Sequence, residues 1–296
     1  MKDLLVKTCC VFSVWYLVFC FSQATLAAES ATPQPQAKPK QHAEPKQRII
    51  ALAPHITELL YAIGAGEQLV GVSAFSDYPQ AAKVLPQVAN YAGVNLEAIL
   101  ALKPDLVIAW KTGNVAADIS RLQQFGINVV YSDPIQISDI ANELRYLGDV
   151  TGHQQQAEVV ATDFERQLAE IKAEYRNKPR LKVFFSMGTE PLTSVANQAW
   201  PAQAMALCAT DNIIASASND YPQPGLEQVL QEAPEVIIQA TAGATPADTR
   251  FWQAYPVIPA VALGQFVTVD ADLLYRTSPR TLTGIRQLCQ GLDSYR

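Results

Sequence analysis

From residue 48 onward, short apolar runs of strand length alternate with stretches whose apolar residues follow a helical period. The apolar runs predict strands at residues 48–52, 69–72, 106–109, 128–131 and 181–185. Helices are expected between the first four of them, at residues 57–63, 96–102 and 116–125. Near-continuous apolar strands separated by helices are typical of parallel sheets that helices cover on both faces. The pattern therefore predicts an α/β fold.

An internal repeat divides this pattern into two similar parts. Residues 96–108 and 226–238 both run through a helix, a proline, an acidic residue and a buried strand. Because one αβ unit recurs late in the chain, we expect two similar lobes, each with a central parallel sheet covered by helices.

The stretch between the two parts, residues 140–178, predicts one long helix. Only Gly148 and Gly152 interrupt it, and no glycine or proline follows residue 154 until Pro179. Its apolar residues recur at helical spacing and would form one face: Ala157, Val160, Ala161, Phe164, Leu168, Ile171 and Tyr175. About 24 helical residues span about 36 Å, enough to join two lobes. A stiff connection of this kind predicts a small opening motion.

The first 28 residues have the three-part pattern of a secretory signal peptide. Lysines precede an apolar run from Cys9 to Phe21, and small residues follow it up to Ala28. An uncleaved membrane anchor, or a lipoprotein attached at Cys20, is the alternative. Residues 29–47 hold four prolines and no large apolar residue, so they are expected to form a disordered tether. The remaining chain is expected to divide into an N-terminal lobe (48–139), the connecting helix (140–178) and a C-terminal lobe (179–296).

The cysteine distribution agrees with export. Three of the five cysteines lie in the signal segment, which leaves Cys208 and Cys289. An even pair in an oxidising compartment predicts a disulfide, with two buried free thiols as the alternative. The bond would close a loop of roughly 80 residues, worth about 4 kcal/mol in a chain-entropy account.

Composition and charge exclude several classes of protein. Of the 296 residues 49% are hydrophobic and 17% charged, so the chain can bury sizeable cores and is not wholly disordered. Residues 49–296 hold 16 basic and 25 acidic residues, within an overall net charge of -6. This acidic body contains no basic stripe, which disfavours nucleic-acid binding.

Motifs for catalysis or metal binding are weak. Ser186 follows a strand as in a nucleophile elbow, but the flanking glycine pattern is incomplete and no histidine follows it, so a secreted serine hydrolase is a distant alternative. The three histidines lack the spacing of metal ligands, and no metal site is expected. His55 alone lies where α/β sheets bind ligands, as a contact residue or as an ordinary residue of the helix start.

Aromatic and other large apolar residues gather where strands end. Those that follow or lie between predicted elements include Phe75, Tyr78, Tyr91, Trp110, Met187, Trp200, Tyr221 and Tyr275. Each alone suggests packing, but together they would line the face where two lobes meet. Such a surface suits a bulky, partly apolar ligand better than a sugar or an amino acid.

Several segments of the chain resemble the cobalamin and siderophore solute-binding proteins of ABC importers. The resemblance rests on residues 53–59, 75–79, 95–97 and 102–107, and on Trp110 with Gly113 and Asn114. It covers residues 48–293, and the paired cysteines with the tryptophan segment point to the cobalamin branch.

The resemblance implies roles for particular residues. The ligand-binding residues would be Phe75, Tyr91, Trp110, Met187, Tyr221, Asp272, Leu273, Leu274, Tyr275 and Arg276. Glu97 and Glu227, one in each copy of the repeat, match the two acids that engage arginines of the membrane permease.

The sequence therefore predicts a periplasmic protein without catalytic activity or resident cofactor. It would capture cobalamin (vitamin B12) between its lobes and deliver it, as a monomer, to an inner-membrane permease and its ATPase subunits. A ferric siderophore or haem is the alternative ligand. An anionic siderophore would favour Arg276 and Arg280, and haem would need His55 or a tyrosine as axial ligand.

Overall fold

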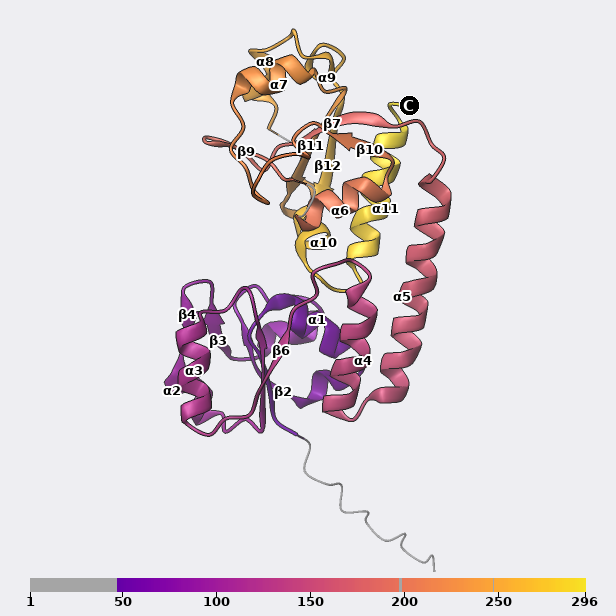
Figure 1. Ribbon diagram of the computed structural model, residues 1–296. Helices are drawn as coiled ribbons and strands as arrows, with labels where there is room; N and C mark the ends of the chain where they lie inside the picture. The colour runs from indigo at the N-terminus through magenta and orange to yellow at the C-terminus, as the bar shows by residue number, and fades with distance from the viewer. Residues whose placement is uncertain (1–46, 197–198, 247) are drawn as a thin grey trace, which may run out of the picture. The chain divides into compact units, whose positions relative to one another are not determined.

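Two parallel sheets organise the part of the chain that the computed structural model describes, residues 47–196, 199–246 and 248–296 (Figure 1). The first sheet has the strand order β4-β3-β2-β1-β5-β6, and only β4 runs antiparallel to its neighbour. Its strands are β1 (Ile49–Ala51), β2 (Leu69–Ser73), β3 (Gln87–Asn90), β4 (Gly93–Val94), β5 (Leu106–Trp110) and β6 (Val129–Ser132). The predicted α/β class is confirmed.

Alternate residues of the first sheet face two different helix layers, because side chains alternate along a strand. Ile49 and Ala51 belong to a core shared with α1 (Pro54–Ala62) and α4 (Asp139–Thr151). Ile50, between them, belongs to the core under α2 (Leu96–Ala101) and α3 (Ala116–Gln124). Short 3-10 helices at Ala65–Gln68 and Gln80–Val84 complete this half.

The second sheet follows the same rule with the order β10-β7-β11-β12, all parallel. Phe185 packs toward α6, α10 and α11, whereas Phe184 packs under α7, α8 and α9. The strands are β7 (Leu181–Phe185), β10 (Thr210–Asn212), β11 (Val236–Thr241) and β12 (Phe266–Asp270), with a separate hairpin of β8 (Gly188–Thr189) and β9 (Leu192–Thr193). The helices are α6 (Trp200–Leu207), α7 (Leu226–Glu232), α8 (Arg250–Gln253), α9 (Pro259–Ala262), α10 (Ala271–Tyr275) and α11 (Thr281–Asp293), with a 3-10 turn at Ala242–Ala244.

The connection between the sheets corrects the prediction of a single helix over residues 140–178. It consists of α4 and α5 (Gln154–Tyr175), which lie side by side (Figure 1). Gly152 ends α4 in the left-handed conformation (φ 76°), which glycine adopts without strain. Gly148 then allows the close approach of the two helices, because a Cβ there would lie 2.4 Å from that of Ala157. Only α5, 22 residues and about 33 Å long, makes the crossing.

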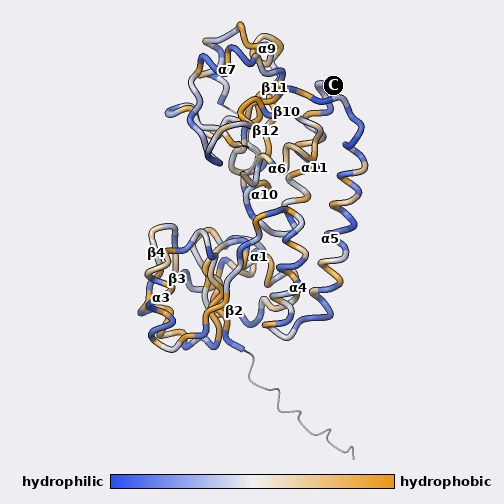
Figure 2. The backbone as a smooth tube through the Cα atoms, viewed as in Figure 1, coloured by the Kyte–Doolittle hydropathy of each residue, from blue (hydrophilic) through white to orange (hydrophobic). Residues whose placement is uncertain are grey.

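The apolar face predicted for α5 is confirmed. Six of its seven residues are buried, and Val160 packs partly buried against the same core. In Figure 2 apolar residues recur at intervals along α5 among hydrophilic ones, as expected for a helix with one buried face. This core also includes residues of both sheets, so α5 joins the halves through packing as well as through the chain.

The internal repeat extends to backbone conformation and hydrogen bonding. Lys103 and Ala233, at equivalent positions before the proline, both have positive φ (45° and 47°). The acid after each proline then accepts a hydrogen bond of 2.7 Å from a backbone N–H at the start of a strand of its sheet. Asp105 does so from the Arg48 backbone N–H, and Glu235 from that of Lys182. The two copies therefore place α2 and α7 equivalently on their sheets.

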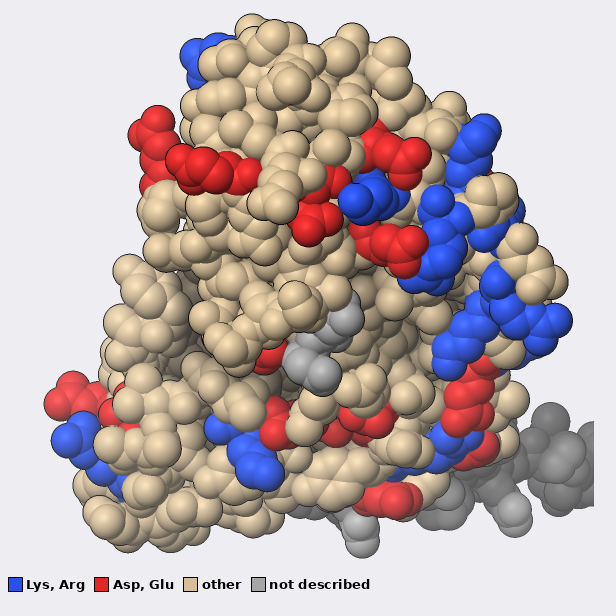
Figure 3. Space-filling view, turned by 45° about the horizontal axis from the view of Figure 1, so that its top comes forward, with Lys and Arg blue, Asp and Glu red and all other residues tan. Residues whose placement is uncertain are grey.

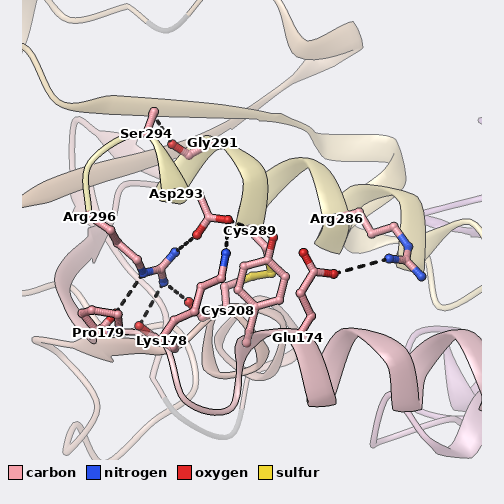
Figure 4. A network of polar contacts seen from close by, with 12 residues as sticks. Glu174, Lys178, Pro179, Cys208, Arg286, Cys289, Gly291, Asp293, Ser294 and Arg296 are labelled. Atoms are coloured by element: carbon pink, nitrogen blue, oxygen red, sulfur yellow. Dashed lines mark hydrogen bonds and ion pairs between the residues drawn. A yellow bond between two sulfur atoms is a disulfide. The ribbon is translucent and has the colours of Figure 1, made fainter.

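The predicted disulfide between Cys208 and Cys289 is present and links α11 to the end of α6, with Cα atoms 4.9 Å apart. Figure 4 shows polar contacts beside it. Asp293 accepts bonds from Lys178, Arg296 and the Tyr175 hydroxyl, which ties the C-terminal end of α11 to that of α5. Burial, followed by the nearby Asp293 charge, raises the pKa of Tyr175 to about 12.

Some predictions are not tested by the described residues. The signal peptide (1–28) and nearly all of the tether (29–47) lie outside them. The lobe boundaries at 139/140 and 178/179 stay a prediction, since the described chain belongs to one compact unit, Pro45–Arg296. Within the described ranges, no helix is both long and apolar enough to span a membrane.

Candidate functional site

The carboxyl ends of the strands in the two sheets meet at one place. Arg276, which follows β12 and α10 in the second half, bonds to Asp77, which follows β2 in the first half, at 2.7 Å. In parallel sheets this edge carries the loops that bind ligands. The loops from both halves therefore surround a common region.

Six large side chains predicted to bind ligand are exposed in these loops, and we call them the aromatic wall. Their exposed fractions are 69% for Phe75, 91% for Tyr91, 38% for Trp110, 41% for Met187, 51% for Tyr221 and 37% for Tyr275. Exposed large apolar groups at the edge where parallel sheets bind ligands are typical of an interaction surface. On the face drawn in Figure 3 charged side chains are scattered over a mostly uncharged surface, and most of the Lys and Arg lie toward its right side.

Trp110 is the best-supported member of the wall. It ends β5, and its backbone N–H donates to the Asn114 side chain at 2.7 Å, while Asn114 donates to the Leu52 carbonyl at 3.0 Å. Position 113 requires glycine, because a Cβ there would lie 1.9 Å from an atom of the Trp110 ring. These contacts explain why tryptophan, glycine and asparagine occur together in this segment.

His55 packs beneath Trp110 and not in the exposed wall. Its ring meets the Trp110 ring edge-on with centroids 5.3 Å apart, and its Nε2 lies 3.3 Å from the Ser132 hydroxyl. Burial lowers the pKa of His55 to about 3, so the imidazole is neutral at physiological pH. The Ser132 hydroxyl in turn donates to Glu143. Burial raises the pKa of Glu143, although the hydrogen bond from Ser132 acts to lower it. His55 is thus a buried support for the tryptophan.

This burial predicts a pH dependence of stability. The unfolded His55 binds its proton near the ordinary pKa of 6.5 and the folded one only near 3, so the unfolded chain holds more protons between these values. The stability that neutral His55 contributes is complete above pH 6.5 and is lost as pH falls toward 3, by up to about 1.4 kcal/mol per pH unit.

In urea unfolding between about pH 4 and 7, His55→Gln is therefore expected to lose less stability on acidification than the unmodified protein. His153→Gln, which changes the residue that precedes α5, is the matched control and should keep the full loss. Identical pH slopes for His55→Gln and the unmodified protein would contradict this assignment.

Phe75 and Tyr91 complete the first half of the wall. Phe75 has a left-handed backbone (φ 63°), an uncommon conformation for an aromatic residue that occurs most often at functional sites. Tyr91 follows β3 in the turn of the β3–β4 hairpin, where the Asn90 side chain accepts from the Ala92 N–H at 2.8 Å. Both side chains project from short, locally stabilised turns.

In the second half, Tyr275 and Tyr221 interact. Burial raises the pKa of the Tyr275 hydroxyl, and the neighbouring Tyr221 raises it further. The Tyr275 ring also packs near the ring of Phe185 at the end of β7, with the two ring centroids 6.5 Å apart. Met187 lies two residues beyond Phe185, where its N–H donates to the Thr193 carbonyl at 2.9 Å.

The structure corrects part of the predicted 272–276 segment. Asp272 is exposed, but Leu274 is fully buried in the core and only 9% of Leu273 is exposed. These two leucines form the apolar face of α10, so their side chains hold the segment in place and do not face a ligand. Asp272 and Tyr275 are the exposed members of the segment.

Arg276, which is predicted to bind ligand, is paired with three carboxylates of the protein. Its guanidinium, 10% exposed, pairs with Glu58 at 2.9 Å, Asp77 at 2.7 Å and Asp272 at 2.9 Å. Burial alone would raise the pKa of Asp77, but the hydrogen bond and charge of Arg276, the Asp77 backbone hydrogen bond and the charge of Lys83 together lower that pKa. Arg276 therefore joins residues of both halves in this structure.

Glu58 is the central residue of this junction, and sequence reasoning gave it no role. Its side chain, 2% exposed, accepts from Arg276, from Arg280 at 2.8 Å and from the Ser278 hydroxyl at 2.5 Å. Arg280 also lies over the Tyr78 ring at 3.7 Å. The available signal was an acidic residue on the apolar face of α1, between Thr57 and Leu59, which must find a buried partner.

Glu97 and Glu227 lie at the second position of α2 and α7. Both are exposed, and neither carboxylate pairs with another group in the part of the chain that the structure describes. Since the two helices sit equivalently in the repeat, each half presents one acid at the same place.

Neither a histidine base for Ser186 nor a metal-binding cluster is found among the described residues. Ser186 is 5% exposed, and its hydroxyl has no hydrogen-bond partner there. His55 and His153 bond to Ser132 and Thr151 respectively, so neither serves Ser186 as a base. No group of three or more His, Cys, Asp or Glu residues in the described ranges is arranged to hold a metal ion.

Comparisons with known proteins agree with this geometry. A family model described as periplasmic binding protein matches residues 49–273. The chain is 42% identical over 252 residues to a vitamin B12-binding protein of Pectobacterium atrosepticum, with 83% of this chain and 88% of that protein covered. The crystal structure of the periplasmic vitamin B12 binding protein BtuF of Vibrio cholerae matches with 37% identity and a TM-score of 0.76, covering 85% of this chain and 98% of that one.

The same fold occurs with other ligands. The periplasmic heme-binding protein RhuT from Roseiflexus sp. RS-1 has a TM-score of 0.75 to this structure at 23% identity, with 85% of this chain and 100% of that chain covered. The fold alone therefore does not distinguish between ligands, and particular side chains must do so.

Proposed function

The chain belongs to the periplasmic binding protein family, and from this premise we propose that it captures cobalamin (vitamin B12) for an ABC importer. The observation that carries the proposal is the aromatic wall, contributed by loops of both halves, in a chain 42% identical to a vitamin B12-binding protein. Flat apolar side chains suit the two faces of a corrin ring, and the exposed Asp272 suits the polar groups at its rim.

The structure offers less for the alternative ligands. An anionic ferric siderophore would need free arginines, but Arg276 and Arg280 are paired with buried Glu58. A haem iron ligated by histidine would need His55, which is buried and bonded to Ser132. The exposed tyrosines of the wall are the residues left for an axial bond to haem.

The proposal includes the protein's setting. Residues 1–28 would be removed as a signal peptide on export to the periplasm, with 29–47 as a tether. The protein would act as a monomer and carry cobalamin as cargo, without a resident cofactor or catalysis. Glu97 and Glu227 would dock on arginines of a permease that works with ATPase subunits, since two acids equivalent by the repeat suit a two-fold symmetric partner.

Removal of Trp110 tests the proposed site. Trp110→Ala should weaken binding of cyanocobalamin at least about 30-fold in a calorimetric titration, because a well-packed aromatic at the centre of an interface contributes 2 kcal/mol or more. Phe125→Ala is the matched control: Phe125 is 61% exposed at the end of α3 and lies outside the wall, so its loss should leave affinity unchanged. Equal affinities for both variants would remove Trp110 from the site.

A further inference from the structure

A small cavity lies beside the aromatic wall, at the carboxyl ends of β7 and β11. Its volume is about 210 Å³, and it opens among Ser186, Met187, Gln239, Thr241, Asp248 and Phe251. We call it the Ser186–Gln239 pocket. It shares Met187 with the wall and lies on the strand edge where ligands bind.

Two buried polar atoms in this pocket have no partner. Ser186 is 5% and Gln239 9% exposed, and neither the Ser186 Oγ nor the Gln239 Oε1 forms a hydrogen bond with the described residues. The other end of the Gln239 amide is occupied, because its Nε2 donates to the Asp248 carbonyl at 3.5 Å. The unpartnered oxygen is therefore the one left for another molecule.

The backbone holds both residues in place. The Ser186 N–H donates to the Ile238 carbonyl at 2.8 Å, which joins the end of β7 to β11 next to Gln239. A buried polar group without a hydrogen-bond partner lowers stability by about 1–3 kcal/mol. Two such groups side by side are therefore expected where a ligand supplies the missing hydrogen bonds.

We propose that the Ser186–Gln239 pocket is a subsite for a neutral carboxamide of the ligand. An amide N–H would donate to Gln239 Oε1, and the Ser186 hydroxyl would donate to the amide carbonyl. The corrin rim of cobalamin carries amides of this kind, so the inference rests on the proposed function and assigns a place to one of them.

The charges around the pocket distinguish an amide from a carboxylate. No Lys or Arg side chain lines it, and Asp248 does. Hydrogen bonds from Arg250 lower the pKa of Asp248 to about 2, so Asp248 is negative at neutral pH. A carboxylate has no proton to donate to the Gln239 oxygen, an acceptor, whereas an amide supplies the donor that the oxygen needs.

Two substitutions of matched size test the subsite by titration with cyanocobalamin. Gln239→Met and Ser186→Ala should each weaken binding about 3- to 10-fold, the range for one neutral hydrogen bond, and the double variant more than either alone. Thermal unfolding of Ser186→Ala without ligand should be unchanged or shifted upward, because this change removes only a buried polar atom that lacks a partner. Ser194→Ala, at another buried serine without a partner but outside the pocket, should leave affinity unchanged.

The outcomes separate the subsite from the function. If the unmodified protein binds cyanocobalamin and both variants bind equally well, the subsite is wrong and the proposed function stands. Lowered unfolding temperatures with unchanged affinity would assign both residues a structural role instead. If the unmodified protein does not bind cyanocobalamin, the proposed function fails and the subsite fails with it.

Discussion

Replacing Glu58 by leucine is expected to lower the free energy of unfolding by about 3–5 kcal/mol, the largest effect on stability among the predictions made for this protein. The substitution leaves Arg276 and Arg280 without their shared carboxylate, in positions where the two side chains are 10% and 26% exposed. It also removes the partner of the buried Ser278 hydroxyl. Urea unfolding followed by circular dichroism measures the change.

A matched control separates burial from the loss of an ion pair. Glu158 pairs with Arg145 at 2.7 Å, but its side chain is 58% exposed. Because exposed ion pairs contribute roughly 0–1 kcal/mol, Glu158→Leu should change stability by no more than that. A loss at Glu58 no larger than the loss at Glu158 would show that the junction between the halves contributes little.

Reversing the charge of Glu97 and Glu227 together is expected to abolish cobalamin import while leaving cobalamin binding intact. Each acid is exposed on a short helix, and no described residue pairs with it, so lysine is accommodated without loss of a contact. In the proposed docking each lysine would face a permease arginine, so that repulsion between two cations replaces the attraction between an acid and an arginine. Each single variant should therefore lower uptake about tenfold or more.

Uptake of labelled cyanocobalamin by cells that carry the cognate importer measures this effect, and calorimetry measures binding in parallel. Asp149→Lys, an exposed acid at the far end of α4, is the control and should support normal uptake. Normal uptake by the double variant would rule out the docking role. Lost binding would instead move the two acids into the ligand site.

The order of strands and helices could be predicted because each element imposes its own local spacing on the apolar residues along the chain. The repeat was also readable from the sequence, and the structure extends it to the backbone conformation, since Lys103 and Ala233 share an uncommon positive φ. The continuous helix over residues 140–178 was wrong, because Gly152 ends α4 while Gly148 lets α5 return alongside it. A glycine in a polar helical stretch does not by itself reveal which of these two uses it has.

The candidate site shows the same division between local and long-range information. Trp110, Gly113 and Asn114 lie within five residues of one another, and their contacts follow from that short segment. Glu58 and Arg276 are 218 residues apart, so no local pattern indicates that they pair. Sequence reasoning therefore assigned Arg276 to the ligand and missed Glu58. It also assigned Leu273 and Leu274 to the ligand because their sequence neighbours were assigned to it. The helical periodicity of α10 instead directs both side chains into the core.

The central question for this protein is whether its ligand is cobalamin. Calorimetric titration of the purified protein with cyanocobalamin, haemin and a ferric siderophore in parallel tests this directly. The proposed function predicts one-to-one binding of cyanocobalamin at micromolar or tighter affinity, a higher unfolding temperature in its presence, and much weaker binding of the other two. Absence of both heat and a thermal shift with cyanocobalamin, together with tight binding of haemin or the siderophore, would contradict it.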